Sequence, residues 1–257
     1  MSKIIACVNE KGGVAKTTTI KNLAIGLAAR GKKVLAIDLD PSANLTTALG
    51  IHVTKEQKTI LDIFKLSKDC EDVPEGYAIM QHEEGIDVIC SVKELHAFES
   101  ELICAIQREI VLRRYLISIK DDYDYIIIDC PPSLNMLTIN SMTTADSVLV
   151  PIQCEYYALE GLSQLIHTIN LVKERLNPDL RIDGVVFTMY DSRTNLSMQV
   201  VENVKQNLNQ KVYNTLIPRN IRLAEAPSYG MPINMYDPKS AGAEAYMQLA
   251  EEVIKNK

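Results

Sequence analysis

The stretch KGGVAKTT, residues 11–18, is the most informative part of this 257-residue chain. It follows the apolar run Ile4–Val8 and leads into an amphipathic stretch, Ile20–Ala29. This order of strand, glycine-rich loop and helix is the setting in which a phosphate-binding loop works. Backbone N–H groups of such a loop point inward, and the helix that follows adds the positive end of its dipole. The stretch therefore predicts a site for a phosphate-bearing ligand.

Two side chains of this stretch suit phosphate chemistry, and three positions depart from the usual G-x-x-x-x-G-K-[ST] pattern. Lys16 is placed to reach a β- or γ-phosphate, and the hydroxyl of Thr17 is placed to ligate Mg²⁺. Glu10 replaces the first glycine, Lys11 adds a second lysine, and Ala15 replaces the last glycine. The methyl group of residue 15 leaves two alternatives open: the loop adjusts to it, or it weakens ATP binding or hydrolysis.

The composition favours one α/β domain over residues 1–257. Apolar residues make up 47% of the chain, enough for a large buried core, and no repeat or long linker divides it. The chain has no run of eighteen apolar residues of the kind that predicts a transmembrane helix. The net charge of −6 argues against binding nucleic acid over the whole surface, but it permits a local basic patch. Without a C-x-x-C pair, the cysteines are expected to be reduced core residues of a cytoplasmic protein: Cys7, Cys70, Cys90, Cys104, Cys130 and Cys154.

Apolar runs rich in β-branched residues alternate with helical patterns along the chain. The expected strands are Ile4–Val8, Val34–Asp38, Ile86–Cys90, Tyr125–Asp129, Ser147–Pro151, Ile182–Met189 and Val212–Ile217. The expected helices lie near Thr17–Ala29, Glu101–Ile119, Ile139–Thr144, Leu159–Leu176, Leu196–Leu208 and Ala243–Lys255. This alternation favours right-handed crossovers in a doubly wound, mostly parallel sheet with helices on both faces. The stretch 54–85 is less periodic, and we expect short helices and a hairpin there.

Two of the expected strands end in carboxylates, at the edge of the sheet where ligands bind in such folds. Asp129 ends one strand and suits a Walker-B role, in which it holds Mg²⁺ directly or through a water. Asp38 and Asp40 are two residues apart, so they would share a face of a regular strand unless the turn at Pro41 separates them. We expect one of them to join the metal shell and the other to position a water. A single Asp at a strand end is often a helix cap, but three beside a phosphate loop favour a metal site.

These residues resemble the deviant Walker A superfamily of ParA/Soj, MinD and the nitrogenase iron protein. Residues 11–17 resemble its Walker A motif, and Asp38–Ser42 resembles its D-x-D-P-Q segment, with Ser42 in place of glutamine. Further matches point to the ParA/Soj branch and run through essentially the whole chain in the family's order. They are DCPPS at 129–133, EYYALEG at 155–161, YDSRT at 190–194, IPRN at 217–220, LAEAPS at 223–228 and YDPKS at 236–240.

The resemblance implies a P-loop ATPase that forms a homodimer with ATP and Mg²⁺ and turns over slowly on its own. Lys11 would cross the interface to phosphates held by the partner subunit, while Lys16 would bind phosphate in its own subunit. Asp40 would orient the attacking water, and Thr17, Asp38 and Asp129 would form the metal set. The remaining nucleotide contacts would come from Gly12, Gly13, Val14, Ala15 and Thr18 in the loop and from Pro218, Arg219 and Asn220 along the adenine.

Nonspecific DNA binding has a modest direct signal. Residues 203–224 lack an acidic side chain and contain Lys205, Lys211, Arg219 and Arg222, which would form a basic face whose DNA affinity falls with salt. The alternative is an ordinary solvated helix and strand with two ligand-facing arginines. The resemblance favours DNA, because ParA/Soj dimers bind it nonspecifically. We expect no membrane partner, because the C-terminal stretch 246–257 carries Glu251 and Glu252 and is typical of a packing helix.

Together with the resemblance, the sequence predicts a cytoplasmic, nucleoid-associated ATPase that drives chromosome or plasmid partitioning. The resemblance implies that a ParB/Spo0J-like protein accelerates its hydrolysis by inserting a basic segment. One alternative is a nucleotide-dependent module that binds DNA or a partner but hydrolyses ATP negligibly because of Ala15, and another is a MinD-like positioning ATPase. A third is a small-molecule kinase or ligase that uses the same loop, against which the sequence shows no obvious acceptor-substrate site.

Overall fold

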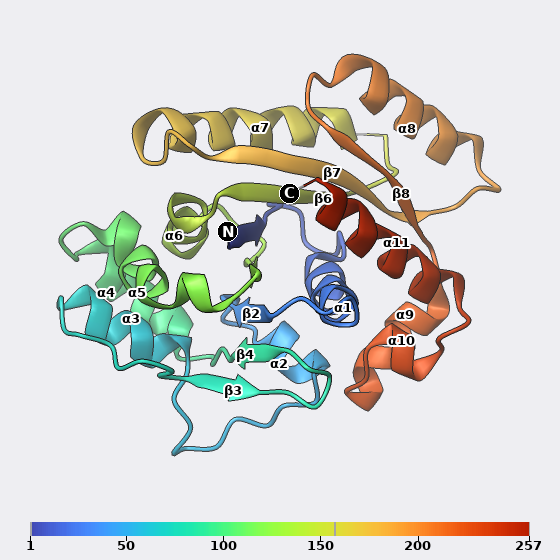
Figure 1. Cartoon of the computed structure of the whole chain (residues 1–257). Helices are drawn as coiled ribbons and strands as arrows, with labels where there is room; N and C mark the ends of the chain where they lie inside the picture. The colour runs from blue at the N-terminus through green and yellow to red at the C-terminus, as the bar shows by residue number, and fades with distance from the viewer. Residues whose placement is uncertain (1, 157, 257) are drawn as a thin grey trace.

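A computed structural model describes residues 2–156 and 158–256, and an eight-stranded sheet runs through the centre of this part of the chain (Figure 1). The strands are β1 (Lys3–Cys7), β2 (Val34–Asp38), β3 (Ile79–Gln81), β4 (Asp87–Ile89), β5 (Tyr125–Asp129), β6 (Ser147–Gln153), β7 (Arg181–Tyr190) and β8 (Val212–Pro218). Their order across the sheet is β3-β4-β2-β5-β1-β6-β7-β8. The pair β3–β4 is antiparallel, and the other neighbouring pairs are parallel.

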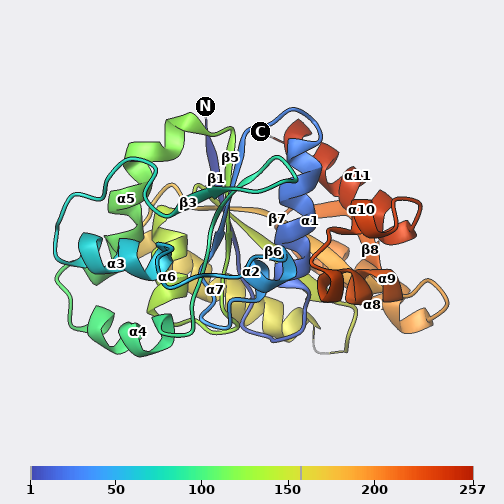
Figure 2. The same ribbon diagram turned by 90° about the horizontal axis from the view of Figure 1, so that it is seen from below.

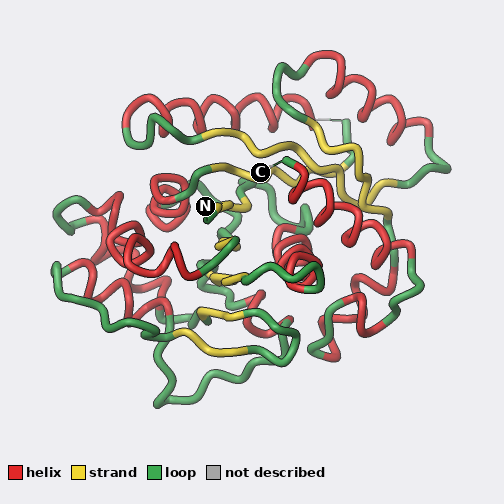
Figure 3. Tube along the Cα trace, viewed as in Figure 1, coloured by secondary structure: helices red, strands yellow, loops and turns green. Residues whose placement is uncertain are grey.

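Helices cover both faces of the sheet. They are α1 (Lys16–Ala28), α2 (Asn44–Ala48), α3 (Ile60–Lys68), α4 (Leu95–Ile103), α5 (Val111–Ile119), α6 (Met136–Thr144), α7 (Ala158–Arg175), α8 (Asn195–Asn207), α9 (Ile221–Glu225), α10 (Ile233–Tyr236) and α11 (Ala241–Lys255), with the short 3₁₀ helices η1 (Arg108–Ile110), η2 (Lys120–Asp122) and η3 (Ala226–Tyr229). One layer holds α3 to α8, and the other holds α1, α2 and α9 to α11 (Figures 1 and 2). Figure 3 separates the yellow strands from these two red helical layers.

The two layers follow from how apolar side chains alternate along the strands. On β1, Ile4 packs into the core beneath α3 to α8, whereas Ile5 and Cys7 pack against α1 and α11. Residues one apart on a strand face opposite sides, so a strand covered on both faces must be apolar throughout. Helix α1 in turn buries Ile20 and Leu23 completely, and each such side chain contributes about 1.5–3 kcal/mol to folding.

Parallel pairing brings the carboxyl ends of distant strands to one edge of the sheet. Cys7 at the end of β1 is in register with Asp129 at the end of β5, and Asp129 is in register with Asp38 at the end of β2. The ends of β6, β7 and β8 lie along the same edge because those strands are also parallel to β1. The loop after β1 therefore lies between the carboxylates on one side and the ends of β7 and β8 on the other.

The predicted fold class is confirmed, and most predicted elements are present. The stretch 54–85 contains α3 and the first strand of the β3–β4 hairpin, as expected. The single helix predicted over Glu101–Ile119 is wrong: α4 ends at Ile103, and α5 begins at Val111. Gln107 between them has φ 54°, a left-handed conformation that no α-helix accommodates.

Candidate functional site

The loop between β1 and α1 closes around the ammonium group of Lys16. This side chain is 7% exposed, and its Nζ donates to the carbonyls of Asn9 at 2.9 Å and Lys11 at 3.3 Å. Both acceptors are neutral backbone groups, so the charge is solvated by the loop itself. An anion that enters the loop meets this cation together with the N-terminus of α1.

Ala15 keeps the left-handed conformation that the loop requires. It stands directly before α1 with φ 66° and ψ 34°, and Gly13 two residues earlier has φ 75°. For an L-residue this conformation costs about 1–2 kcal/mol because Cβ crowds the following carbonyl, whereas glycine adopts it freely. The backbone of the loop is thus preserved in spite of the methyl group, and the effect of Ala15 on ATP binding and hydrolysis stays a prediction.

Lys11 points out of the loop and forms an ion pair within its own chain. Its Nζ contacts Oε2 of Glu155, which lies in the loop after β6, and the two side chains are 56% and 51% exposed. The backbone N–H of Lys11 donates to Oδ1 of Asn9 at 3.0 Å. In the single chain the second lysine is therefore held apart from Lys16, available to another molecule only after it leaves Glu155.

Asp129 and Thr17 form a buried pair beneath the loop. The hydroxyl of Thr17 donates to Oδ2 of Asp129 at 2.6 Å. Oδ1 of Asp129 is also buried and accepts no hydrogen bond from any residue in the described ranges. Burial, followed by the nearby charge of Asp38, raises the pKa of Asp129 well above its usual range. An unpartnered carboxylate oxygen beside a hydroxyl is the donor set that a hard divalent cation prefers.

Asp38 is the last residue of β2, whereas Asp40 lies beyond the strand, just before the turn at Pro41. Asp38 is fully buried, and its oxygens accept from Thr46 N at 2.8 Å, Thr46 Oγ1 at 2.7 Å and Asp40 N at 3.2 Å. Burial raises the pKa of Asp38 to about 7, although these hydrogen bonds oppose the rise. Asp40, in contrast, lines the cavity described next. Asp38 does not line that cavity, its oxygens are used by Thr46 and the Asp40 N–H, and its role as a metal ligand stays a prediction.

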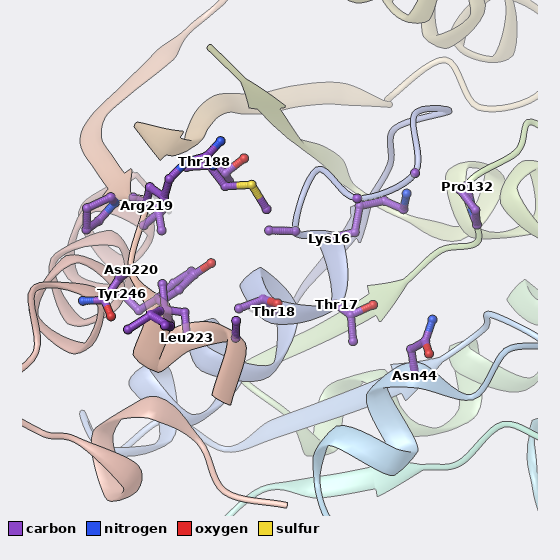
Figure 4. A pocket seen from close by; sticks show the side chains of 18 of the residues that line it. Lys16, Thr17, Thr18, Asn44, Pro132, Thr188, Arg219, Asn220, Leu223 and Tyr246 are labelled. Atoms are coloured by element: carbon purple, nitrogen blue, oxygen red, sulfur yellow. The ribbon is translucent and has the colours of Figure 1, made fainter. Parts of the chain in front are cut away.

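A cavity of about 640 Å³ extends from the loop to the segment after β8 (Figure 4). Its volume lies within the range of small-molecule sites, about 300–1,000 Å³. The predicted residues that line it are Gly12, Gly13, Ala15, Lys16, Thr17, Thr18, Asp40, Pro218, Arg219 and Asn220. The sequence did not indicate Asn44, Pro132, Thr188, Met189, Leu223 and Tyr246, which also line it. Thr188 and Met189 end a strand that was predicted, and ligands bind at that end of parallel strands. Their position in the cavity could therefore have been predicted from the sequence.

The four basic residues proposed as a DNA-binding face do not gather in one place. Arg219 lines the cavity, and Arg222 pairs with Glu225 at 2.9 Å. Lys211 precedes β8 whereas Arg219 follows it, so the extended strand separates their Cα atoms by about 26 Å. Lys205 lies in the last turn of α8. The strand thus carries Lys211 and Arg219 to opposite ends, and the contact of these four residues with DNA stays a prediction.

The cysteines, the acidic side chains and the helices provide further observations on metal and membrane binding. In residues 2–156 and 158–256 no three His, Cys, Asp or Glu side chains are grouped to hold a metal ion, and all six cysteines are unpaired. Burial raises the pKa of the Cys130 thiol to about 12, which makes it a poor metal ligand. Within the same ranges, no helix is both long enough and apolar enough to span a bilayer. Tyr156 is 80% exposed, while Tyr157 lies outside the described residues.

Comparisons with known proteins agree with this geometry. A family model described as an AAA domain matches residues 2–182. The sporulation initiation inhibitor protein Soj of Bacillus subtilis is 53% identical over 256 residues, covering 100% of each chain. The chromosome partitioning protein ParA of Caulobacter vibrioides is 48% identical over 254 residues, covering 98% of this chain and 94% of its own. The solved structure of cobyrinic acid a,c-diamide synthase from Mycobacterium smegmatis, with bound ATP analogue and magnesium, has a TM-score of 0.85 and 35% identity, covering 99% of this chain and 95% of its own.

Proposed function

Because the chain belongs to the ParA/Soj family of the MinD/ParA superfamily, we propose that it is a partitioning ATPase. The observation that carries the proposal is the cavity that joins the phosphate loop to Pro218–Asn220. One end offers the cation Lys16 and the N-terminus of α1, and the other offers apolar walls. A nucleoside triphosphate has the matching polarity, with phosphates at one end and a flat base at the other.

The residues at the loop support ATP with Mg²⁺ as the ligand. Phosphate oxygens that enter the loop would replace the carbonyls of Asn9 and Lys11 as partners of the Lys16 ammonium. Thr17 and Asp129 would hold Mg²⁺, since Oδ1 of Asp129 is buried without a partner in the described chain. When bound, the cation supplies charge neutralisation for the phosphates. Asp40 lines the same cavity and would orient the attacking water.

The proposed protein is a dimerising switch formed by a single domain, residues 1–257. In an ATP-bound homodimer, Lys11 would leave Glu155 and contact the phosphates of the partner subunit. Two acidic chains that bury two triphosphates between them need this additional positive charge. The switch would act in the cytoplasm on the nucleoid, and a ParB/Spo0J-like protein would stimulate its hydrolysis.

The first test is ATP·Mg²⁺ binding by isothermal titration, followed by phosphate release with DNA and the ParB-like protein of the same genome. We expect binding, slow release from the protein alone and faster release with both additions. Asp40→Ala should retain binding and lose release, because it removes the water-positioning group. Binding without release under every condition would establish the alternative of a binding module, and absence of binding would overturn the proposal.

Nonspecific DNA binding requires its own test, because the basic residues are dispersed. We propose that Lys205 and Arg222 contact DNA phosphates in the ATP-bound dimer. Each contact removed should lower the slope of log affinity against log salt by about 0.9. Fluorescence anisotropy with a random duplex would measure that slope for Lys205→Glu and Arg222→Glu, with Lys65→Glu on α3 as a control of equal charge. No binding by the ATP-bound protein at low salt would refute the DNA role.

A further inference from the structure

Two side chains from neighbouring strands hold the phosphate loop by its carbonyl groups. Gln153, the last residue of β6, donates from Nε2 to the carbonyl of Gly13 at 2.6 Å. Thr188 on β7 has its Oγ1 at 3.0 Å from the carbonyl of Val14 and at 3.1 Å from that of Ile152. Thr188 and Val14 are both buried, so water does not compete for this bond. The loop is thus tied to the sheet at two consecutive peptide groups.

These ties fix the direction of the amide groups that follow. In a trans peptide the C=O and the N–H point in opposite directions. The carbonyls of Gly13 and Val14 face Gln153 and Thr188, so the N–H groups of Val14 and Ala15 face away from β6 and β7. Neither of these two N–H groups donates to an acceptor among the residues that the structure describes. Unpartnered amides of a loop before a helix are the groups that bind phosphate oxygens.

Ala15 gives the ties a particular importance in this chain. Its left-handed φ of 66° carries the steric cost described above, which a glycine at this position would not have. Without an external restraint, residue 15 gains by relaxing to negative φ, and its N–H would turn with it.

We propose that Gln153 and Thr188 are positioning residues that hold Ala15 in its left-handed conformation and so direct loop amides toward the phosphate. The proposal rests on the proposed function, because it assumes that the cavity binds a nucleoside triphosphate. It goes beyond that function in assigning phosphate affinity to two side chains that need not touch the phosphates. Its distinctive consequence is that their contribution depends on which residue occupies position 15.

The experiment measures ATP·Mg²⁺ affinity by titration calorimetry for Thr188→Val, which keeps the shape of the side chain and removes the hydroxyl. We expect a loss of about tenfold, equivalent to one good hydrogen bond. Thr188→Ser retains the hydroxyl and should stay within about twofold of the unmodified protein. With Ala15→Gly in the same chain, the loss caused by Thr188→Val should shrink to about threefold or less, because glycine needs no restraint at positive φ.

Gln153→Leu provides a second variant that avoids a buried substitution, since Gln153 is only half-buried. It should show the same dependence on residue 15, and backbone hydrogen exchange of residues 12–16 should accelerate in both variants only when Ala15 is present. Equal losses of affinity with and without the Ala15→Gly substitution, or no loss in a folded Thr188→Val protein, would overturn the proposal. Failure of the unmodified protein to bind ATP would instead overturn the proposed function.

Discussion

The methyl group of Ala15 introduces backbone strain into the phosphate loop. The residue adopts a left-handed conformation between Gly13 and the first turn of α1, and the loop still wraps the ammonium of Lys16. The cost is therefore borne by the folded protein as strain, in a segment where ligand binding depends on the same backbone. The sequence alone identified the unusual residue, but its consequence depends on φ, which only the structure supplies.

Ala15→Gly should stabilise the protein. Relief of the left-handed strain outweighs the extra flexibility that glycine brings to the unfolded chain, for a net gain of about 1 kcal/mol. For a domain of this size the melting temperature would rise by roughly 2–4 °C, measured by calorimetry. Ala28→Gly near the end of α1 is the matched control and should lower it, because that residue is helical. A fall in melting temperature for Ala15→Gly would show that the left-handed conformation of Ala15 does not destabilise the folded protein.

Lys21 should make stability depend on pH in a defined window. Its Nζ is buried and donates to the carbonyls of Met231 at 2.8 Å and Ala48 at 3.3 Å, and burial lowers its pKa to about 8. Between this value and the ordinary 10.5, the unfolded chain binds more protons than the folded one, so stability rises with pH across that range. The full rise amounts to about 3 kcal/mol.

Urea unfolding of the wild-type protein and Lys21→Met at about pH 7.5, 9 and 10.5, values chosen to span this window, would measure the effect. The difference in unfolding free energy between the two proteins should change in favour of the wild type as pH increases. Lys65→Met, at an exposed position on α3, should follow the wild-type profile. A constant difference between wild type and Lys21→Met would show that the lysine keeps an ordinary pKa.

The packing of β7 on β8 depends on a glycine that the sequence did not single out. A Cβ on Gly184 would lie 2.5 Å from Cε2 of Tyr213, whose buried hydroxyl contacts Asp183. Gly184→Ala should therefore destabilise the protein by about 1–3 kcal/mol through overpacking. Thermal unfolding would show this as a lowered melting temperature.

Gly161 in α7 offers the matched control for that substitution. A Cβ there meets no atom within 4 Å, so Gly161→Ala should be neutral or stabilising by up to about 1 kcal/mol. If Gly184→Ala left the melting temperature unchanged or raised it, as expected for Gly161→Ala, Tyr213 would not pack closely against Gly184.

Glu155, in the loop after β6, should oppose dimerisation because it competes for Lys11. This residue holds Lys11 in an ion pair that is half exposed, and such pairs contribute about 0.2–1 kcal/mol. Glu155→Gln removes the competitor, so the ATP-bound dimer should form at up to about fivefold lower protein concentration at low salt. Glu160→Gln removes an acidic residue from the same surface hollow and should have little effect. Weaker dimerisation of Glu155→Gln would mean that the carboxylate helps the dimer.

Elements with a strong period were predictable, and short or strained ones were not. The strand Tyr125–Asp129 is an uninterrupted apolar run that ends in a carboxylate, the helix near Leu159–Leu176 spans several turns, and both are present. Helices α2, α9 and α10 have only four or five residues, too few to establish a period of about 3.6. The same limit applies to the site, since Thr17 and Asp129 follow from motifs whereas Tyr246 reaches the cavity from a helix far along the chain.

A nucleotide-sized cavity lies at the carboxyl edge of the sheet. Its parts come from the loop after β1, the turn after β2 and the segment after β8, which parallel pairing brings to the same edge. Lys11 lies outside the cavity lining and contacts Glu155 instead. In the dimer that we propose, this lysine would leave Glu155 and contact the phosphates of the partner subunit.

Sedimentation velocity of the wild-type protein and Lys11→Ala, each with saturating ATP·Mg²⁺ and with ADP·Mg²⁺, tests the shared site most directly. Titration calorimetry on the same samples confirms that nucleotide is bound. We predict a wild-type dimer with ATP and a monomer with ADP, and a Lys11→Ala monomer with both nucleotides although it still binds ATP. A Lys11→Ala protein that dimerises with ATP as the wild type does, or a wild-type protein that stays monomeric with ATP bound, would contradict a shared site.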